Sequence, residues 1–283
     1  MLDGYLLETR LADLHGRLCD LGSVLVAFSG GADSAFLLAA AVRALGPDRV
    51  LAATAVSDSL PAAELTAATE FAAGLGVAHL TPPTREMERD GYRANAGNRC
   101  YFCKAELLDV LAPLAAVHGL SAVATGTNAD DARSAFRPGI RAAGERGAVT
   151  PLRDSGLTKA QVRAASRRWG LRTWDKPAAA CLSSRIAYGL EISPARLARV
   201  ERAEASAREA LSAHGIPVRD LRVRDVGDTA RLEVDRDLVA RVAACTPVLA
   251  AVRSAGFTEV EMDPRGFRSG SMNEALTEPP ASG

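Results

Sequence analysis

The residues best suited to chemistry lie between positions 29 and 34 and read Ser-Gly-Gly-Ala-Asp-Ser. Two adjacent glycines let the backbone approach an anion closely, and two serine hydroxyls add hydrogen-bond donors. Residues 24–28 before them are typical of a short buried strand, and a helical pattern begins at Ala35. The N-terminus of that helix would add unpaired N–H groups and the positive end of its dipole. The sequence therefore predicts a phosphate-binding turn formed by Ser29, Gly30, Gly31, Asp33 and Ser34.

The phosphate-binding turn differs from two common nucleotide motifs. It lacks the lysine of a Walker A loop and the spaced glycines of a dinucleotide-binding fingerprint. It resembles the pyrophosphate loop, or PP-loop, of the ATP pyrophosphatase superfamily, whose members cleave ATP between the α and β phosphates and adenylylate a substrate. A purely structural turn is the weaker alternative, because the whole hexapeptide stands between a strand and a helix. The resemblance implies that ATP and Mg²⁺ bind here and that Asp33 helps to hold the metal.

Three of the five cysteines form the second chemical feature. Cys100 and Cys103 belong to a Cys-x-x-Cys motif that leads into a predicted helix, where residues i and i+3 share one face. Cys181 lies far along the chain. An odd number of cysteines in a reducing compartment points to ligation or catalysis rather than to a disulfide framework. Cys19 and Cys245 lie on helical patterns and are expected to be core residues.

Several chemistries could use these thiols. A structural zinc site would need a fourth ligand and usually a second Cys-x-x-Cys motif, which the sequence lacks. A thioredoxin-like redox pair would be expected at the start of a βαβ unit rather than after a remote loop. Three thiolates around an iron–sulfur cluster would leave one iron open, and that position could carry an extra sulfide.

Strands and helices alternate through the first part of the chain. The patterns predict strands at 24–28, 50–56, 76–80 and 121–125, helices at 2–19, 107–118 and 158–169, and a loop containing glycine and arginine at 137–153. This alternation predicts right-handed βαβ units and a parallel sheet, in which ligands bind beyond the carboxyl ends of the strands. The phosphate-binding turn, residues 56–57 and residues 126–131 should therefore converge on one ATP site. Its further contact residues are Val56, Ser57, Gly126 and Thr127.

The alternation stops around residues 176–189, where we place a domain boundary. Beyond it the patterns predict a helix at 193–214, a hairpin of strands 221–226 and 230–235, a helix at 238–255 and a strand at 258–262. The expected fold class is α/β, with a parallel-sheet PP-loop ATP pyrophosphatase domain (adenine nucleotide alpha hydrolase-like) at 1–185. A smaller α+β domain for substrate binding or oligomerisation follows at 186–275, and a disordered tail at 276–283.

Charged residues share faces of the predicted hairpin. Arg222 and Arg224 lie on one strand face, and Arg231, Glu233 and Asp235 lie on one face of the partner strand. A cross-strand charge ladder explains this pattern about as well as a binding function does.

The composition favours a small substrate. The 283 residues carry no formal net charge, which argues against a dedicated nucleic-acid binder. No apolar run reaches the length of a membrane span, and the N-terminal residues lack the basic start and cleavage site of a signal peptide. We therefore expect a globular cytoplasmic protein without a membrane partner.

Several segments taken together resemble the LarE family. They are the phosphate-binding turn, Asn-Arg-Cys-Tyr-Phe-Cys-Lys at 98–104, CLSSRIAYG at 181–189, LRVRDVGDTARLEV at 221–234 and GFRSGSMNE at 266–274. The likeness spans nearly the whole chain. Members of this family are ATP-dependent sulfur transferases that help to build the nickel-pincer cofactor of lactate racemase.

The LarE resemblance implies a reaction. A carboxylate of pyridinium-3,5-biscarboxylic acid mononucleotide is adenylylated, pyrophosphate leaves, and sulfur replaces the activated oxygen to give a thiocarboxylate. Some members sacrifice a cysteine from the segment corresponding to 176–185, and others, which carry Cys-x-x-Cys, use a three-cysteine [4Fe-4S] cluster. The presence of Cys100 and Cys103 favours the cluster, with Cys181 as the third ligand and a separate sulfide source. The resemblance also implies a homo-oligomer and substrate contacts from Arg185, Glu204, Arg222, Arg224, Glu233 and Arg268.

Other functions explain the sequence less well. A tRNA 2-thiolation enzyme can combine the same loop with three cysteines, but it should show a basic face and often an added nucleic-acid or zinc module. An amidotransferase or synthetase of the superfamily would leave the three cysteines unexplained. A nucleotide-binding regulatory protein without turnover would have no need for an activating acidic residue at Asp33.

Overall fold

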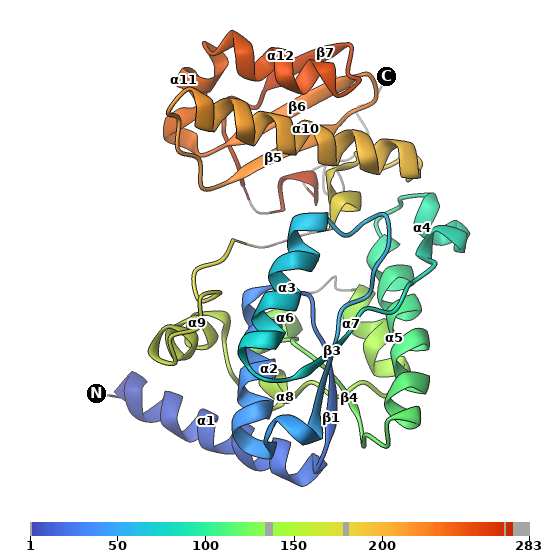
Figure 1. Ribbon diagram of the computed structural model, residues 1–283, viewed down its shortest axis with the longest axis vertical. Coiled ribbons are helices and arrows are strands. Elements are labelled where there is room, and N and C mark those ends of the chain that lie inside the picture. Colours follow the sequence, from blue (N-terminus) through green and yellow to red (C-terminus); the bar gives the residue numbers. More distant parts are fainter. Residues whose placement is uncertain (1, 134–137, 178–180, 269, 274–283) are drawn as a thin grey trace. The chain divides into compact units, whose positions relative to one another are not determined.

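The computed structural model describes residues 2–133, 138–177, 181–268 and 270–273 (Figure 1). The chain divides into two compact units. The first unit comprises Met1–Glu86 and Cys100–Ala179, and the second comprises Met87–Arg99 and Ala180–Gly283. The tail predicted at 276–283 lies outside the described residues.

A four-stranded parallel sheet forms the centre of the first unit. Its strands are β1 (Val24–Ala27), β2 (Val50–Ala53), β3 (Ala78–Leu80) and β4 (Val123–Thr125), in the order β3-β2-β1-β4. Every residue of β1 and β2 is buried, as expected for strands covered on both faces. The predicted α/β class and parallel sheet are therefore confirmed.

Helices cover both faces of this sheet. The first unit contains α1 (Leu2–Leu21), α2 (Ala32–Leu45), α3 (Ala62–Gly74), most of α5 (Arg99–Val117), α6 (Ala129–Arg133), α7 (Pro138–Glu145), α8 (Pro151–Asp154), α9 (Lys159–Arg168) and the 3-10 helix η1 (Pro47–Arg49). Val24 and Val26 of β1 share a core with α1, α2 and α9, whereas Leu25 and Ala27 share one with α5. Alternate strand residues thus point to opposite helical layers.

One expectation for the first unit is confirmed and another needs correction. The helix to which residues 107–118 were assigned begins at Arg99, so the Cys-x-x-Cys motif occupies its first turn, as predicted. The segment predicted as a loop at 137–153 contains α7 and α8. Proline opens both of these short helices, where its missing N–H group costs nothing.

The second unit is built on a mixed sheet with strand order β5-β6-β7. It contains β5 (Leu221–Asp225), β6 (Thr229–Val234), β7 (Glu259–Met262), α4 (Asp90–Arg93), α10 (Pro194–Ala213), α11 (Val239–Ala243), α12 (Thr246–Ser254) and the 3-10 helices η3 (Leu182–Arg185), η4 (Arg236–Leu238) and η5 (Ser271–Asn273). The hairpin β5–β6 is antiparallel, and β7 joins β6 in parallel, as a connection through helices allows. Buried side chains of α10 and α12 supply the core.

The helix predicted at 238–255 is interrupted in the structure. It consists of α11 and α12, separated at Ala244 and Cys245. Pro247 stands in the first turn of α12, and a proline there cannot continue a helix that arrives from α11.

The second unit differs from the domain predicted at 186–275. It begins at Ala180 and takes in Met87–Arg99. The amide of Asn95 donates to the carbonyl oxygens of Ala187 and Leu190 at 2.8 and 3.0 Å, and Ile192 N donates to Arg93 O at 2.9 Å. These bonds join segments about 90 residues apart, so no local pattern predicts them.

Candidate active site

The phosphate-binding turn joins β1 to α2. Gly30 has φ of 70°, a left-handed conformation that favours glycine, and Gly31 precedes the first residue of α2. The Ser29 and Ser34 hydroxyls lie 3.0 Å apart, and Ser34 Oγ donates to Gly31 O at 3.2 Å. Glycine at the N-cap has no side chain to cap the helix, so backbone N–H groups of the first turn are suited to an anion.

Asp33 carries a buried oxygen without a partner. Its Oδ1 atom has no hydrogen bond in the described structure, and burial raises the pKa of this carboxyl. Lys159 and a hydrogen bond from Asn128 act in the opposite direction, and Asp131 adds to the increase in pKa. A carboxylate with a free buried oxygen fits a hard divalent cation such as Mg²⁺, which commonly binds one or two carboxylates together with substrate phosphates.

The end of β4 lies against this turn. A Cβ atom added at Gly126 would lie 2.8 Å from Ser34 N and 3.1 Å from the carbonyl carbon of Asp33. Thr127 Oγ1 lies 3.2 Å from Thr125 Oγ1, and Asn128 Oδ1 accepts from backbone N–H groups at the start of α6. The loop after β4 therefore meets the phosphate-binding turn, as the parallel sheet predicts.

The turn after β2 is held by a buried acid. Thr54 Oγ1 donates to Phe28 O at 2.7 Å, and Val56 pairs with Pro83 beyond the strand. Ser57 Oγ donates to Glu86 at 2.5 Å. Val56 and Ser57 thus lie on a fixed turn, and nucleotide contact by them stays a prediction. Glu86 has no motif around it, and the sequence analysis missed it.

Lys176 is a second residue that the sequence analysis missed. Its ammonium donates to Gly30 O at 3.0 Å and to Glu64 at 2.6 Å. It lies 146 residues from Gly30 along the chain. The one signal in the sequence for such a residue is that the phosphate-binding turn contains no lysine or arginine of its own.

The Cys-x-x-Cys motif occupies an ordered helix start. Cys100 is exposed and Cys103 is half-buried. Between them, Tyr101 donates to Glu145 of α7 at 2.5 Å, and a Cβ atom added at Gly139 would lie 3.3 Å from Cys100 O. Two cysteine thiols at i and i+3 therefore share the first turn of α5, as predicted.

Cys181 lies in the second unit and is also a free, half-buried thiol. It precedes η3, and its carbonyl oxygen accepts from Ser184 Oγ at 2.7 Å and from Arg185 at 3.0 Å. Arg99 donates to Ser183 O in the same segment at 2.9 Å. Within the part of the chain that the structure describes, no group of three or more His, Cys, Asp or Glu residues is arranged to hold a metal ion.

The other two cysteines are not core residues, which corrects the expectation. Cys19 is exposed, with its sulfur 3.5 Å from His15 Nε2. Cys245 is half-buried at the start of α12. Helical periodicity placed Cys19 on α1 correctly, but its side chain is exposed, with the sulfur 3.7 Å from Ala44 O of α2.

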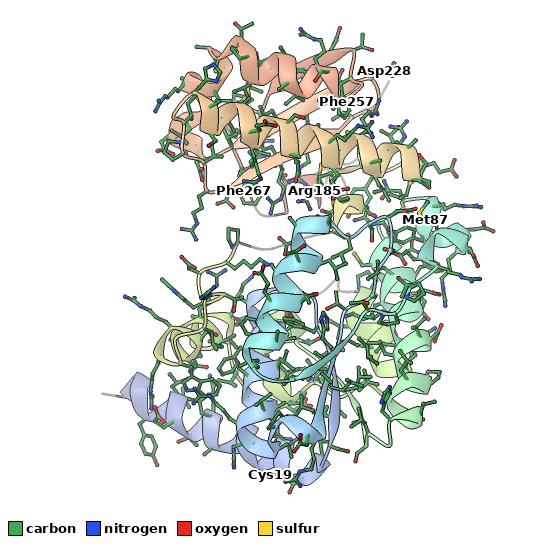
Figure 2. All side chains as sticks on the ribbon, viewed as in Figure 1. Cys19, Met87, Arg185, Asp228, Phe257 and Phe267 are labelled. Atoms are coloured by element: carbon green, nitrogen blue, oxygen red, sulfur yellow. The ribbon has the colours of Figure 1, made fainter. Side chains whose placement is uncertain are left out.

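The predicted substrate contacts of the second unit form a cluster of charges, which we call the arginine cluster: Arg185, Arg222, Arg224, Glu204 and Glu233. Arg185 donates through two nitrogens to Glu204, at 3.0 and 3.3 Å. Arg224 donates to Glu233 at 2.7 Å, although its cross-strand neighbour is Arg231. The Arg222 guanidinium stacks over the Phe267 ring, 5.1 Å from its centroid. Figure 2 labels Phe267 and Arg185.

The arginine cluster has the electrostatics of an anion site. All three arginines are buried, and they outnumber the two carboxylates. Burial, together with the positive charges of Arg185 and Arg224, lowers the pKa of Arg222 to about 10, and Glu204 acts in the opposite direction. Arg224 Nε is a buried donor without a hydrogen-bond partner among the described residues. A bound phosphate or carboxylate would satisfy both the excess charge and this donor.

Arg268 is half-buried, donates to Gly266 O at 3.0 Å and approaches Asp263 at 3.5 Å. Its predicted substrate contact stays a prediction.

The fold and the turn define the class of the first unit. A four-stranded parallel sheet, with a Ser-Gly-Gly-Ala-Asp-Ser turn between its central strand β1 and α2, makes it a PP-loop α/β domain. No protein-family model matches the chain. No described helix is both long and apolar enough to cross a membrane.

Comparison with known proteins identifies the family. The chain is 40% identical over 275 residues to an uncharacterized protein of Synechocystis sp., covering 96% of this chain and 100% of that protein. It is 34% identical over 272 residues to the pyridinium-3,5-bisthiocarboxylic acid mononucleotide synthase of Lactiplantibacillus plantarum, covering 96% of each. An uncharacterized protein of Methanocaldococcus jannaschii is 26% identical over 175 residues, 62% of this chain and 66% of that protein. The chain belongs to the LarE family, as its motifs predict.

Proposed function

We propose that the protein is an ATP-dependent sulfur transferase that converts pyridinium-3,5-biscarboxylic acid mononucleotide to its bisthiocarboxylic acid, for the nickel-pincer cofactor. The observation that carries this proposal is the 34% identity, over 96% of both chains, to a synthase named for that product. The two sites on separate units, one suited to a nucleotide phosphate and one to an acidic substrate, support it.

The phosphate-binding turn would activate the substrate. A substrate carboxylate oxygen attacks the α phosphorus of ATP, the bond from that phosphorus to the bridging oxygen breaks, and pyrophosphate leaves with the electron pair. Backbone N–H groups at the start of α2 stabilise the phosphate charge. The unpartnered oxygen of Asp33 supports its role as a ligand of Mg²⁺, which neutralises the leaving group.

The arginine cluster would bind the substrate anion. Its excess positive charge and the unpartnered Arg224 Nε favour a phosphate or carboxylate over a neutral ligand. This separates the present proposal from tRNA thiolation, which would require an extended exposed basic surface rather than a small buried cluster.

Cys100, Cys103 and Cys181 would supply the sulfur chemistry. Three cysteine thiols, none of them in a disulfide bond, suit a [4Fe-4S] cluster in donor type, and two of them share one helical turn. Such a cluster, when bound, provides an iron without a protein ligand at which sulfide can be held. The protein residues hold the cluster and position the activated carboxylate, and they are not consumed.

The decisive experiment is anaerobic iron and sulfide determination on the purified protein, combined with turnover. With ATP, Mg²⁺ and the biscarboxylic mononucleotide, we expect pyrophosphate release and a thiocarboxylate product by mass spectrometry. ADP and phosphate as products would exclude the mechanism. Thiolation of tRNA without thiolation of the mononucleotide would establish the alternative substrate.

A further inference from the structure

The phosphate-binding turn obtains a cation from a distant part of the first unit. Residues 29–34 contain one charged side chain, the acidic Asp33. Lys176 reaches this turn and donates to Gly30 O at 3.0 Å. Because a triphosphate carries several negative charges, a lysine beside this turn can supply the cation that a Walker A loop carries within its own motif.

Two contacts determine where the Lys176 ammonium lies. Arg163 of α9 donates to the backbone oxygen of Lys176 at 2.9 Å, which fixes the main chain. Glu64, in the first turn of α3, binds the ammonium at 2.6 Å. The side chains of Lys176 and Glu64 are 22% and 27% exposed, so water reaches the pair. A partly exposed pair is worth little, and a phosphate carrying more charge competes with Glu64 effectively.

We propose that Lys176 is the phosphate-binding lysine of this turn, and that on ATP binding its ammonium exchanges Glu64 for the β and γ phosphates. This inference rests on the proposed function, because it assigns a residue to the same ATP site. When the bond between the α phosphorus and the bridging oxygen breaks, negative charge develops on the departing pyrophosphate. The ammonium, with three donors, stabilises that charge, and Glu64 holds the lysine in place while the site is empty.

The proposal makes a distinction between ligands. Lys176 should matter for ATP and pyrophosphate, which carry the β phosphate, and not for AMP. We would measure binding of ATP, pyrophosphate and AMP to the full-length protein by calorimetry with Mg²⁺. The variants are Lys176→Gln, Glu64→Gln and, as a matched loss of an exposed charge nearby, Arg172→Gln.

In Lys176→Gln we expect affinities for ATP and pyrophosphate to fall about 10- to 100-fold, with AMP affinity unchanged. In Glu64→Gln, affinity for pyrophosphate should be unchanged or tighter, because a competing carboxylate is removed. Arg172→Gln should match the unsubstituted protein.

Equal losses for AMP and pyrophosphate in Lys176→Gln would show a structural role and overturn the proposal, as would no change for either. If Lys176→Gln fails to fold, the affinity of Glu64→Gln for pyrophosphate tests the proposal instead. A tenfold weaker affinity in Glu64→Gln would mean that Glu64 does not compete with the phosphates for Lys176, and the proposal would be overturned. If the unsubstituted protein releases pyrophosphate on turnover and Lys176→Gln binds ATP and pyrophosphate with normal affinity, this inference alone is overturned. Unsubstituted protein that binds neither ATP nor pyrophosphate overturns the proposed function, and this inference with it.

Discussion

Asp33 shows how one residue can favour function at the expense of stability. Its unpartnered oxygen and its raised pKa have the same cause, burial without sufficient compensation. The ionised form that a metal requires is therefore the form that the empty site disfavours.

We predict that Asp33→Asn stabilises the protein and abolishes pyrophosphate release. A folded-state pKa above the unfolded value means that stability falls as pH rises from the unfolded pKa through the folded one. Asparagine has no charge to bury, so its advantage should be absent near pH 4 and present at pH 7, at about 1 kcal/mol or 2–4 °C in Tm. Thermal unfolding of both proteins across this pH range measures it. A difference in Tm between the two proteins that stays the same from pH 4 to pH 7 would contradict the prediction.

In the second unit, the charge of Arg222 leads to a prediction about substrate binding. Its pKa of about 10 still leaves it charged at neutral pH, and an added anion would relieve the repulsion from Arg185 and Arg224. Arg222→Ala should raise the apparent substrate constant about 10- to 100-fold and leave ATP binding intact. Arg231→Ala removes an arginine from the neighbouring strand, where it pairs with Glu261 at the surface, and serves as the control. Equal effects of the two substitutions would refute substrate binding by the cluster.

At the scale of elements, β4 and α2 approach each other so closely that only glycine fits. The backbone of Gly126 contacts the backbone of Asp33 and Ser34, which cannot move without changing the start of α2. The ATP site therefore depends on backbone packing between two elements as well as on its side chains.

We predict that Gly126→Ala lowers the free energy of unfolding by about 1–3 kcal/mol and raises the KM for ATP, because the added methyl group must push β4 from α2. Gly144→Ala in α7 is the matched control, since a Cβ atom there meets nothing within 4 Å. Alanine should be neutral or slightly stabilising in that helix. Chemical denaturation and initial-rate kinetics measure both effects, and an ATP KM unaltered in Gly126→Ala would contradict the prediction.

At the scale of the whole molecule, the chain passes between its two units after Glu86, after Arg99 and after Ala179. Cys100 is the first residue after the second passage, and Cys181 follows the third closely. The three proposed ligand thiols are thus divided between the units, two in the first and one in the second.

We predict that alanine at Cys100, Cys103 or Cys181 abolishes iron retention and sulfur transfer but preserves pyrophosphate release. Activation depends on the phosphate-binding turn, which contains no cysteine. Cys19→Ala, at an exposed position on α1, should retain full activity. The sacrificial alternative predicts iron-free activity for one turnover and a mass loss at Cys181 equal to one hydrogen sulfide, and intact-protein mass spectrometry distinguishes the two.

Much of the architecture could be predicted from local patterns. Apolar runs located the parallel strands, Gly-Gly located the turn at 29–34, and period-two alternation located the β5–β6 hairpin. These features depend on steric preferences and hydrophobic periodicity within a few residues, so the sequence alone determines them. Pro247 is a local signal for the break between α11 and α12. The apolar pattern of 238–255 nevertheless led to the prediction of one continuous helix.

Other features were decided by tertiary structure alone. Lys176 meets Gly30, Glu86 meets Ser57, and Asn95 joins the segment that follows Cys181, across separations of 146, 29 and about 90 residues. The sequence supplied the arginines and glutamates of the second unit, but only the tertiary structure decided that Arg224 binds Glu233 and Arg185 binds Glu204. Such pairs leave no local signature, because each forms only after hydrophobic burial has brought distant backbone segments together, and that burial is non-directional.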